Sequence, residues 1–76
     1  MTRVTLFTAR SCHLCERARS VLTKTGVPFQ EVDITGDREL EARYREWLPV
    51  VEIDGERAFV YYVDEAAFRR KVAAQT

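Results

Sequence analysis

The sequence predicts an α/β protein with the element order β-α-β-α-β-β-α, in which helices cover both faces of a four-stranded mixed sheet. Short runs rich in β-forming residues alternate with segments whose apolar residues recur at helical spacing. The pair Asp54-Gly55 lies between two apolar runs and predicts a hairpin. Strands joined through a helix should be parallel, with a right-handed crossover, and the hairpin then adds an antiparallel edge.

The first strand is expected at Val4–Phe7, buried on at least one face. A polar loop follows, and Ser11 at its end suits the N-cap of a helix. Apolar residues from Leu14 to Leu22 then fall on one helical face. Gly26 is expected to close this helix, and Pro28 prevents its continuation.

The second strand is expected at Phe29–Ile34, where apolar and polar residues alternate imperfectly. Asp37 or Thr35 can cap the helix that follows, and Pro49 ends it. Leu40, Tyr44, Trp47 and Leu48 recur in this helix at offsets 0, 4, 7 and 8. We expect Leu40, Tyr44 and Trp47 to be core residues.

The hairpin strands are expected at Val50–Ile53 and Glu56–Tyr61, joined by a type I′ turn whose two central residues need positive φ. Asp64 fits the N-cap of the last helix. Val63 can pack against Phe68 across that cap, as in a hydrophobic staple.

Size and composition limit the classes of function that the chain can have. The 76 residues form one domain, residues 1–76, and 12 basic residues balance 12 acidic ones. There is therefore no bulk electrostatic case for nucleic acid or an anionic membrane. The longest apolar stretch, Ala58–Val63, is far shorter than a membrane span. We expect no signal peptide, because Met1-Thr2-Arg3 leads straight into the first strand, and two cysteines are too few for a secreted disulfide framework. We expect a cytoplasmic monomer.

Both cysteines lie in the motif Cys12-His13-Leu14-Cys15, between the first strand and the first helix. The two-residue spacer places both sulfurs on one helical turn. Such a pair can form a redox disulfide or contribute half of a metal site. In a reducing compartment, catalysis or metal binding is favoured over a structural disulfide.

A pattern spread over nearly the whole chain narrows this choice. It consists of Leu6-Phe7-Thr8 before Cys12-x-x-Cys15, Gly26-Val27-Pro28-Phe29 with Glu31, Val32 and Asp33, Leu48-Pro49-Val50, Asp54-Gly55 and Asp64. In this order and at this length, the sequence resembles the thioredoxin superfamily and, within it, the glutaredoxins. The resemblance implies a thioredoxin-like fold, a cis-proline that faces the cysteines, and thiol–disulfide redox activity.

The chain departs from the usual glutaredoxin pattern at three places. The spacer is His13-Leu14 instead of Pro-Tyr, and Ala9 replaces the usual lysine, with Arg10 next to it. Tyr61 and Tyr62 replace the paired glycines that let the glutathione backbone approach closely. The chain thus resembles short, divergent bacterial glutaredoxin-like proteins. The resemblance supports redox chemistry further than it supports glutathione binding. Because side chains alternate along a strand, at most one of these tyrosines should face the site.

Cys12 is the expected nucleophile, because it lies at a helix N-terminus where unpaired N–H groups stabilise a thiolate. Cysteines so placed have pKa values of roughly 3.5–7.5 instead of about 8.5. Arg10 and protonated His13 could lower that pKa further, although His13 is equally well explained as a surface residue. Cys15, on the apolar face one turn later, is the expected resolving thiol.

Pro49, with Leu48 and Val50, is the expected substrate wall. A cis bond before Pro49 would turn the backbone of Val50 toward a substrate, which could pair with it as an added strand. The alternative is a proline that only stops the helix. Asp64 is first an N-cap and second a candidate contact for a ligand amine.

We therefore expect a small dithiol oxidoreductase, active in electron transport and cell redox homeostasis. It would reduce protein disulfides or glutathione mixed disulfides, and glutathione or a reductase would recharge it. No cofactor is expected beyond glutathione as a co-substrate. Two alternatives stay open: metal or iron–sulfur binding through the C-x-x-C, completed by a dimer or by glutathione, and a non-catalytic binding module.

Overall fold

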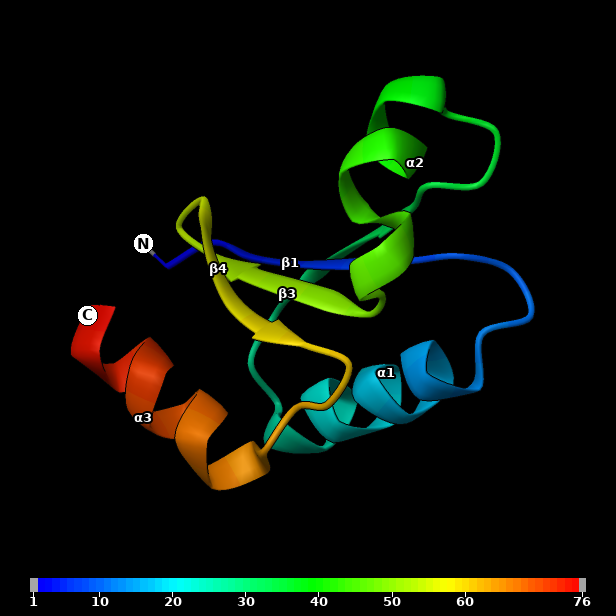
Figure 1. Ribbon diagram of the computed structural model, residues 1–76. Helices are drawn as coiled ribbons and strands as arrows, with labels where there is room; N and C mark the ends of the chain where they lie inside the picture. Colours follow the sequence, from blue (N-terminus) through cyan, green and yellow to red (C-terminus); the bar gives the residue numbers. More distant parts are fainter. Residues whose placement is uncertain (1, 76) are drawn as a thin grey trace.

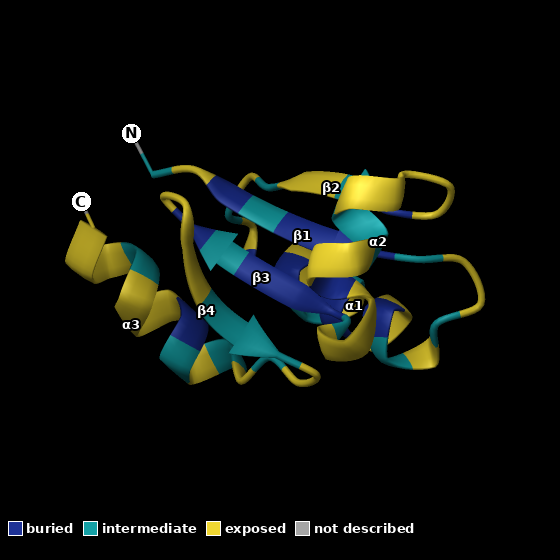
Figure 2. Ribbon diagram, turned by 45° about the horizontal axis from the view of Figure 1, so that its top comes forward, coloured by how far each residue is buried: buried dark blue, intermediate teal, exposed yellow. Residues whose placement is uncertain are grey.

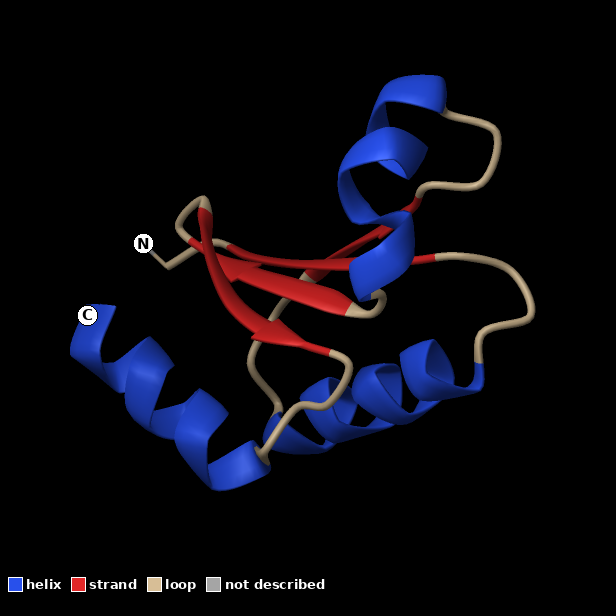
Figure 3. Cartoon of the chain, in the orientation of Figure 1, coloured by secondary structure: helices blue, strands red, loops and turns tan. Residues whose placement is uncertain are grey.

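The structure is a computed structural model that describes residues 2–75. Its elements follow the predicted order (Figures 1 and 3). They are β1 (Val4–Thr8), α1 (His13–Thr25), β2 (Gln30–Asp33), α2 (Arg38–Tyr44), a 3₁₀ turn η1 (Arg45–Trp47), β3 (Val50–Ile53), β4 (Glu56–Val60) and α3 (Glu65–Gln75).

The four strands form one mixed sheet in the order β2-β1-β3-β4. β1 pairs in parallel with β2, while the β1–β3 and β3–β4 pairs are antiparallel. The predicted parallel pair and antiparallel hairpin are thus confirmed. β1 and β3 are the inner strands, and Figure 2 shows burial concentrated along them.

Helices cover both faces of the sheet, as predicted: α1 and α3 lie on one face and α2 lies on the other (Figure 1). The core accordingly consists of two clusters, one on each face of the sheet. The larger cluster lies on the α1–α3 face and includes Leu6, Leu22, Val51 and Phe68. The smaller one lies beneath α2 and is formed by Phe7, Ile34, Tyr44 and Val50.

The start of α1 differs from the prediction by one residue. Ser11 has φ 56°, in the left-handed region, and the N-cap is Cys12, whose sulfur accepts from the backbone N–H of Cys15 at 3.1 Å. Expecting Ser11 to cap was wrong because the chain makes its turn there. The C-terminal end of α1 is as predicted, because Gly26 closes the helix with φ 76°.

The second helix also differs. It ends at Tyr44 and continues as the tighter η1, which carries Trp47 outward to 40% exposure. Helical spacing predicted Trp47 in the core, but a 3₁₀ turn has about three residues per turn and rotates the later positions off that face. Tyr44 is buried as expected and stacks on Phe7 at 4.0 Å. Leu40 packs at the edge of this cluster.

The local signals at the hairpin and the last helix are confirmed. Asp54 and Gly55 have φ of 52° and 84°, as a type I′ turn requires. Asp64 accepts from the backbone N–H of Ala67 at 3.0 Å at the start of α3. Val63 packs against the cluster that contains Phe68.

A polar brace ties α1 to the sheet behind the cysteine loop. Arg19 donates two hydrogen bonds to Glu31, at 2.8 and 2.5 Å, and the buried Thr8 hydroxyl donates a third at 3.0 Å. The bond from Arg19 lowers the pKa of Glu31, partial burial opposes this, and the bond from Thr8 assists it. Thr8 ends β1, so the brace anchors the strand from which the cysteine loop departs.

The brace predicts a pH-dependent loss of stability in Glu31→Gln. The folded pKa of Glu31 lies below its ordinary value of 4.5, so its ion pair stabilises the fold fully above that value. We expect the variant to lose about 1 kcal/mol of unfolding free energy at pH 7. The difference from wild type should shrink as the pH falls through the folded pKa.

Chemical denaturation of both proteins between pH 3 and 7 measures this difference. Glu39→Gln is the matched control, because Glu39 is an exposed α2 carboxylate without an ion pair among residues 2–75. Equal losses in the two variants at pH 7 would show that the brace contributes nothing specific.

Candidate redox site

Cys12 and Cys15 form a disulfide at the start of α1, with their Cα atoms 5.2 Å apart. The two sulfurs differ in environment: Cys15 is 1% exposed, whereas Cys12 is half-buried. One cysteine of the pair is therefore open to an incoming disulfide and the other is covered. This is the asymmetry that the sequence predicted.

The backbone around Cys12 presents an anion-stabilising position. Cys12 is extended, with φ −115° and ψ 103°, and its sulfur lies over the first turn of α1. The backbone N–H of Cys15 points at that sulfur, and the Cys12 carbonyl accepts from Glu16. The N–H groups of a first helical turn have no helical partners, so a reduced Cys12 would be stabilised as a thiolate.

The loop before β3 lies at the same end of the molecule as the cysteines. The Leu48–Pro49 peptide bond is cis, and Pro49 is buried. Its carbonyl accepts from the backbone N–H of Tyr61 at 2.9 Å, and Tyr61 lines a surface hollow together with Leu14 of the cysteine spacer. The predicted cis-proline is thus present, and Tyr61 contacts its carbonyl. Val50 is fully buried and pairs with both Phe7 and Val60. Substrate contact by this wall remains a prediction.

Arg10 lies against the end of β2. Its backbone N–H donates to the Thr35 hydroxyl at 3.2 Å. The hydrogen bond from the Thr35 backbone lowers the pKa of Asp33, and the charge of Arg10 lowers it further. The charge of Arg10 therefore acts on the Asp33 carboxylate, and an effect of Arg10 on Cys12 stays a prediction.

The two remaining predicted contacts differ in their surroundings. The side chain of His13 is 99% exposed, with Nδ1 4.0 Å from the Glu16 carboxylate, which favours the interpretation of a surface residue. Asp64 is exposed and occupied by its capping bond to Ala67. Its contact with a ligand stays a prediction.

The sequence singled out Tyr61 and Tyr62, but it did not predict the hollow that they form with α1. A hollow of about 200 Å³ begins at Leu14 and is lined on one side by α1 and on the other by the β4–α3 connection. We call it the tyrosine hollow, and its lining residues are Leu14, Arg17, Ala18, Val21, Tyr61, Tyr62 and Val63.

The hollow includes neither cysteine, so the prediction that at most one tyrosine faces the redox site stays a prediction. Both tyrosines nevertheless line the hollow, against the strand alternation expected at these positions. The reason is that β4 ends at Val60 and Tyr61 adopts φ 67°, which breaks the alternation. A left-handed non-glycine residue costs roughly 1–2 kcal/mol. The side chain offsets this cost, since its hydroxyl donates to the Glu46 carbonyl at 3.0 Å and its ring lies 6.2 Å from that of Trp47.

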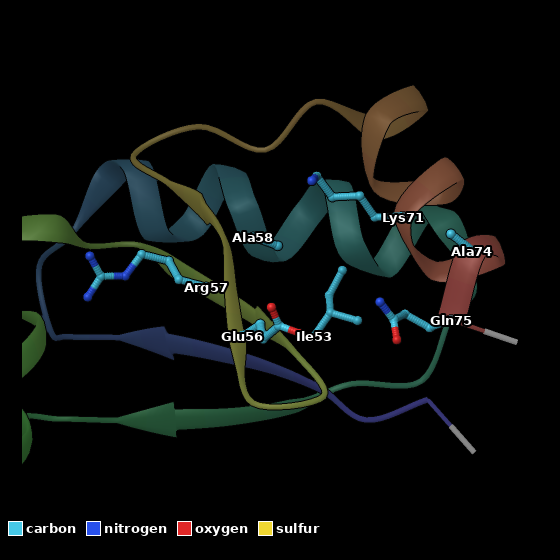
Figure 4. A pocket seen from close by; sticks show the side chains of 7 residues that line it. All are labelled: Ile53, Glu56, Arg57, Ala58, Lys71, Ala74 and Gln75. Carbon is cyan, nitrogen blue, oxygen red and sulfur yellow. The ribbon is translucent and has the colours of Figure 1, made fainter.

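A second hollow, of about 270 Å³, lies between the hairpin and α3 and is shown in Figure 4. Its walls come from β3, β4 and α3, and they include none of the predicted site residues: they are Ile53, Glu56, Arg57, Ala58, Lys71, Ala74 and Gln75. This second hollow is therefore separate from the redox site.

Residues 2–75 contain neither a cluster of metal ligands nor a helix that could span a membrane. No cluster of three or more His, Cys, Asp and Glu side chains there could hold a metal ion. No helix in that range is long and apolar enough to cross a membrane.

The strand order, the helix layers and the C-x-x-C at the start of α1 together define a thioredoxin-like fold. Residues 3–73 match the model of the glutaredoxin-like domain family (DUF836), and the chain belongs to this family. A search of the curated proteins found no significant match.

Solved structures agree on the fold. The X-ray structure of protein XcR50 from X. campestris is 29% identical, with a TM-score of 0.82 over 93% of this chain and 96% of that one. The thioredoxin-like protein BC3987 is 22% identical, with a TM-score of 0.68 over 90% and 97%. Glutaredoxin 1 from Francisella tularensis, solved with cacodylate, is 16% identical, with a TM-score of 0.64 over 99% and 96%.

The difference in burial predicts the order of alkylation in the reduced protein. Iodoacetamide should modify Cys12 well before Cys15, because only Cys12 is open to solvent. Trypsin releases both cysteines in one peptide, residues 11–17, and fragmentation of that peptide locates the label. In denaturant the two rates should converge. Faster labelling of Cys15 in the folded protein would reverse the assignment.

The left-handed Tyr61 predicts an unusual order of stability among variants. Tyr61→Ala should be less stable than Tyr61→Gly by about 1 kcal/mol, because alanine keeps the Cβ penalty while both lose the tyrosine contacts. At Tyr62, which lacks a positive φ, the order should reverse, since glycine there only adds entropy to the unfolded chain. Denaturant unfolding of the four variants checks both signs. The same order at both positions would contradict the explanation.

Proposed function

We propose that this protein is a small dithiol oxidoreductase in which Cys12 attacks and Cys15 resolves. The observation that carries the proposal is the Cys12–Cys15 disulfide at the N-terminus of α1, with one sulfur open and the other covered. Membership of the glutaredoxin-like family supports it. The reaction requires a thiolate, a reachable sulfur and a second thiol, and these two residues would supply all three.

The reaction proceeds in two exchanges. The Cys12 thiolate attacks one sulfur of the substrate disulfide, forms a mixed disulfide, and expels the other sulfur as a thiolate that takes a proton from water. Cys15 then loses its proton, attacks the Cys12 sulfur, and displaces the second substrate sulfur, which is protonated in turn. The substrate gains two electrons and two protons, and the protein is left with the Cys12–Cys15 disulfide. A thiol donor, either glutathione or a reductase dithiol, restores the reduced form.

The substrate is a protein disulfide or a glutathione mixed disulfide. It would lie against the wall formed by Leu48, Pro49 and Val50, with Arg10 and Asp64 at its edges. A monomer in the reducing cytoplasm fits this cycle, because the donor thiols are abundant there.

The proposal predicts opposite outcomes for the two cysteine variants. Cys12→Ser should lose disulfide reductase activity at least a hundredfold, because serine at neutral pH is not a comparable nucleophile. Cys15→Ser should still attack but should accumulate a mixed disulfide through Cys12, detectable by intact mass. Both rates are measured against wild type on a mixed disulfide between glutathione and a cysteine peptide.

Since the two variants make the same chemical change three residues apart, each is the control for the other. Wild-type activity in Cys12→Ser would show that Cys12 is not the nucleophile. Absence of any reductase activity in the reduced wild-type protein, with both thiols titratable, would reject the function itself.

A further inference from the structure

The exposed aromatic side chains gather on the side of the molecule that carries the cysteines. Among residues 2–75, the large exposed hydrophobic residues are Trp47, Tyr61 and Tyr62. Trp47 directly precedes the cis-proline loop, and both tyrosines line the tyrosine hollow beside Leu14. Exposed apolar residues that lie together mark binding surfaces more often than single, scattered ones do.

The wall of the hollow is held in place before any substrate arrives. Tyr61 keeps an unfavourable left-handed backbone and is tied to the η1 turn through Glu46 and Trp47. Strained residues that their surroundings hold in place occur preferentially at functional sites. A rigid aromatic wall loses little conformational entropy when a ligand packs on it.

The residues that line the tyrosine hollow indicate what kind of group would bind there. Arg17 is the charged residue of the hollow, and the other six lining residues are apolar or aromatic. Four of the seven lie on α1, the helix that begins at Cys12: Leu14, Arg17, Ala18 and Val21. A group seated here therefore lies along the helix that begins just after Cys12, with a cation beside it.

We propose that the tyrosine hollow selects polypeptide disulfides in which an apolar side chain neighbours the reacting cysteine and a carboxylate follows nearby. The apolar side chain enters the hollow against Tyr62 and Leu14, and the carboxylate pairs with Arg17. This inference rests on the proposed function and names its substrate class. The chemical step is the two-exchange reduction described above, with the same electron and proton balance.

Glutathione fits this surface poorly. Its residues flanking cysteine are a γ-linked glutamate and a glycine, so it has no apolar side chain for a hollow of about 200 Å³. It could offer only a carboxylate to Arg17. Polypeptide disulfides should therefore be reduced faster than glutathione disulfides of the same reactivity.

The first experiment compares two peptide mixed disulfides that differ only in the residue next to cysteine, Leu or Ser. Wild-type protein should reduce the Leu peptide with a kcat/KM about tenfold higher, the size expected for partial burial of one aliphatic side chain. In Tyr62→Ala this ratio should fall to about two or less. Tyr62 is 68% exposed, so its truncation leaves the core intact. A wild-type ratio near one, or a ratio that Tyr62→Ala leaves unchanged, overturns the inference.

The second experiment tests the charge. A Glu placed two residues from the cysteine should favour reduction over a Lys placed there by about fivefold at low salt, and less at high salt. Arg17→Glu should invert this preference. Arg70→Glu is the matched control, because Arg70 is an exposed arginine of α3 outside the hollow. The same effect in both variants would assign the preference to net charge and reject a role for Arg17.

A binding measurement separates this inference from the proposed function. The same peptides with S-methylcysteine cannot react, and their binding to the oxidised protein can be followed by the fluorescence of Trp47 beside the hollow. Tighter binding of the Leu peptide, lost in Tyr62→Ala, supports the hollow even if no reductase activity is found. Equal binding of the Leu and Ser peptides overturns the hollow even if small disulfides such as bis(2-hydroxyethyl) disulfide are reduced efficiently.

Discussion

The cap at the start of α1 is the interaction on which the site depends. Cys12 occupies the N-cap position, so its sulfur takes the N–H of Cys15 that a serine or aspartate oxygen would otherwise accept. The left-handed turn at Ser11 makes this possible by bringing the chain from β1 onto the helix axis. One local geometry therefore starts the helix, places Cys12 over the positive helix end, and buries Cys15 one turn later.

The sheet brings this cap to the same end of the molecule as the predicted substrate wall, which is formed by Leu48, Pro49 and Val50. β1 and β3 are adjacent inner strands, so the loop that leaves β1 toward Cys12 and the Pro49 loop that enters β3 lie at the same end of the molecule. The Arg19–Glu31–Thr8 brace anchors the end of β1. The bond from Tyr61 to Pro49 anchors the wall. Rigid elements thus hold both halves of the site, as precise positioning of a reacting sulfur requires.

The cysteines and the surface around them have different roles in the proposed function. The cap and the difference in burial support the proposed redox reaction. The proposed choice of partner rests on the tyrosine pair, because this chain has two large rings beside Arg17 at positions where the glutaredoxins that it resembles have small residues. Specificity in such a site arises as much from what no longer fits as from what does.

The sequence by itself determined the element order, the hairpin turn at Asp54-Gly55, the end of α1 at Gly26 and the cysteine pair. Each of these depends on residues within a few positions of one another, where backbone sterics and capping act. The sequence could not place Trp47, because its exposure follows from a 3₁₀ turn that breaks the helical spacing. Nor could it place Tyr61, whose left-handed backbone is stabilised by Glu46 and Trp47, some fifteen residues earlier. The tyrosine hollow and the Arg19–Glu31–Thr8 brace join segments far apart in the chain, so only the tertiary structure decided them.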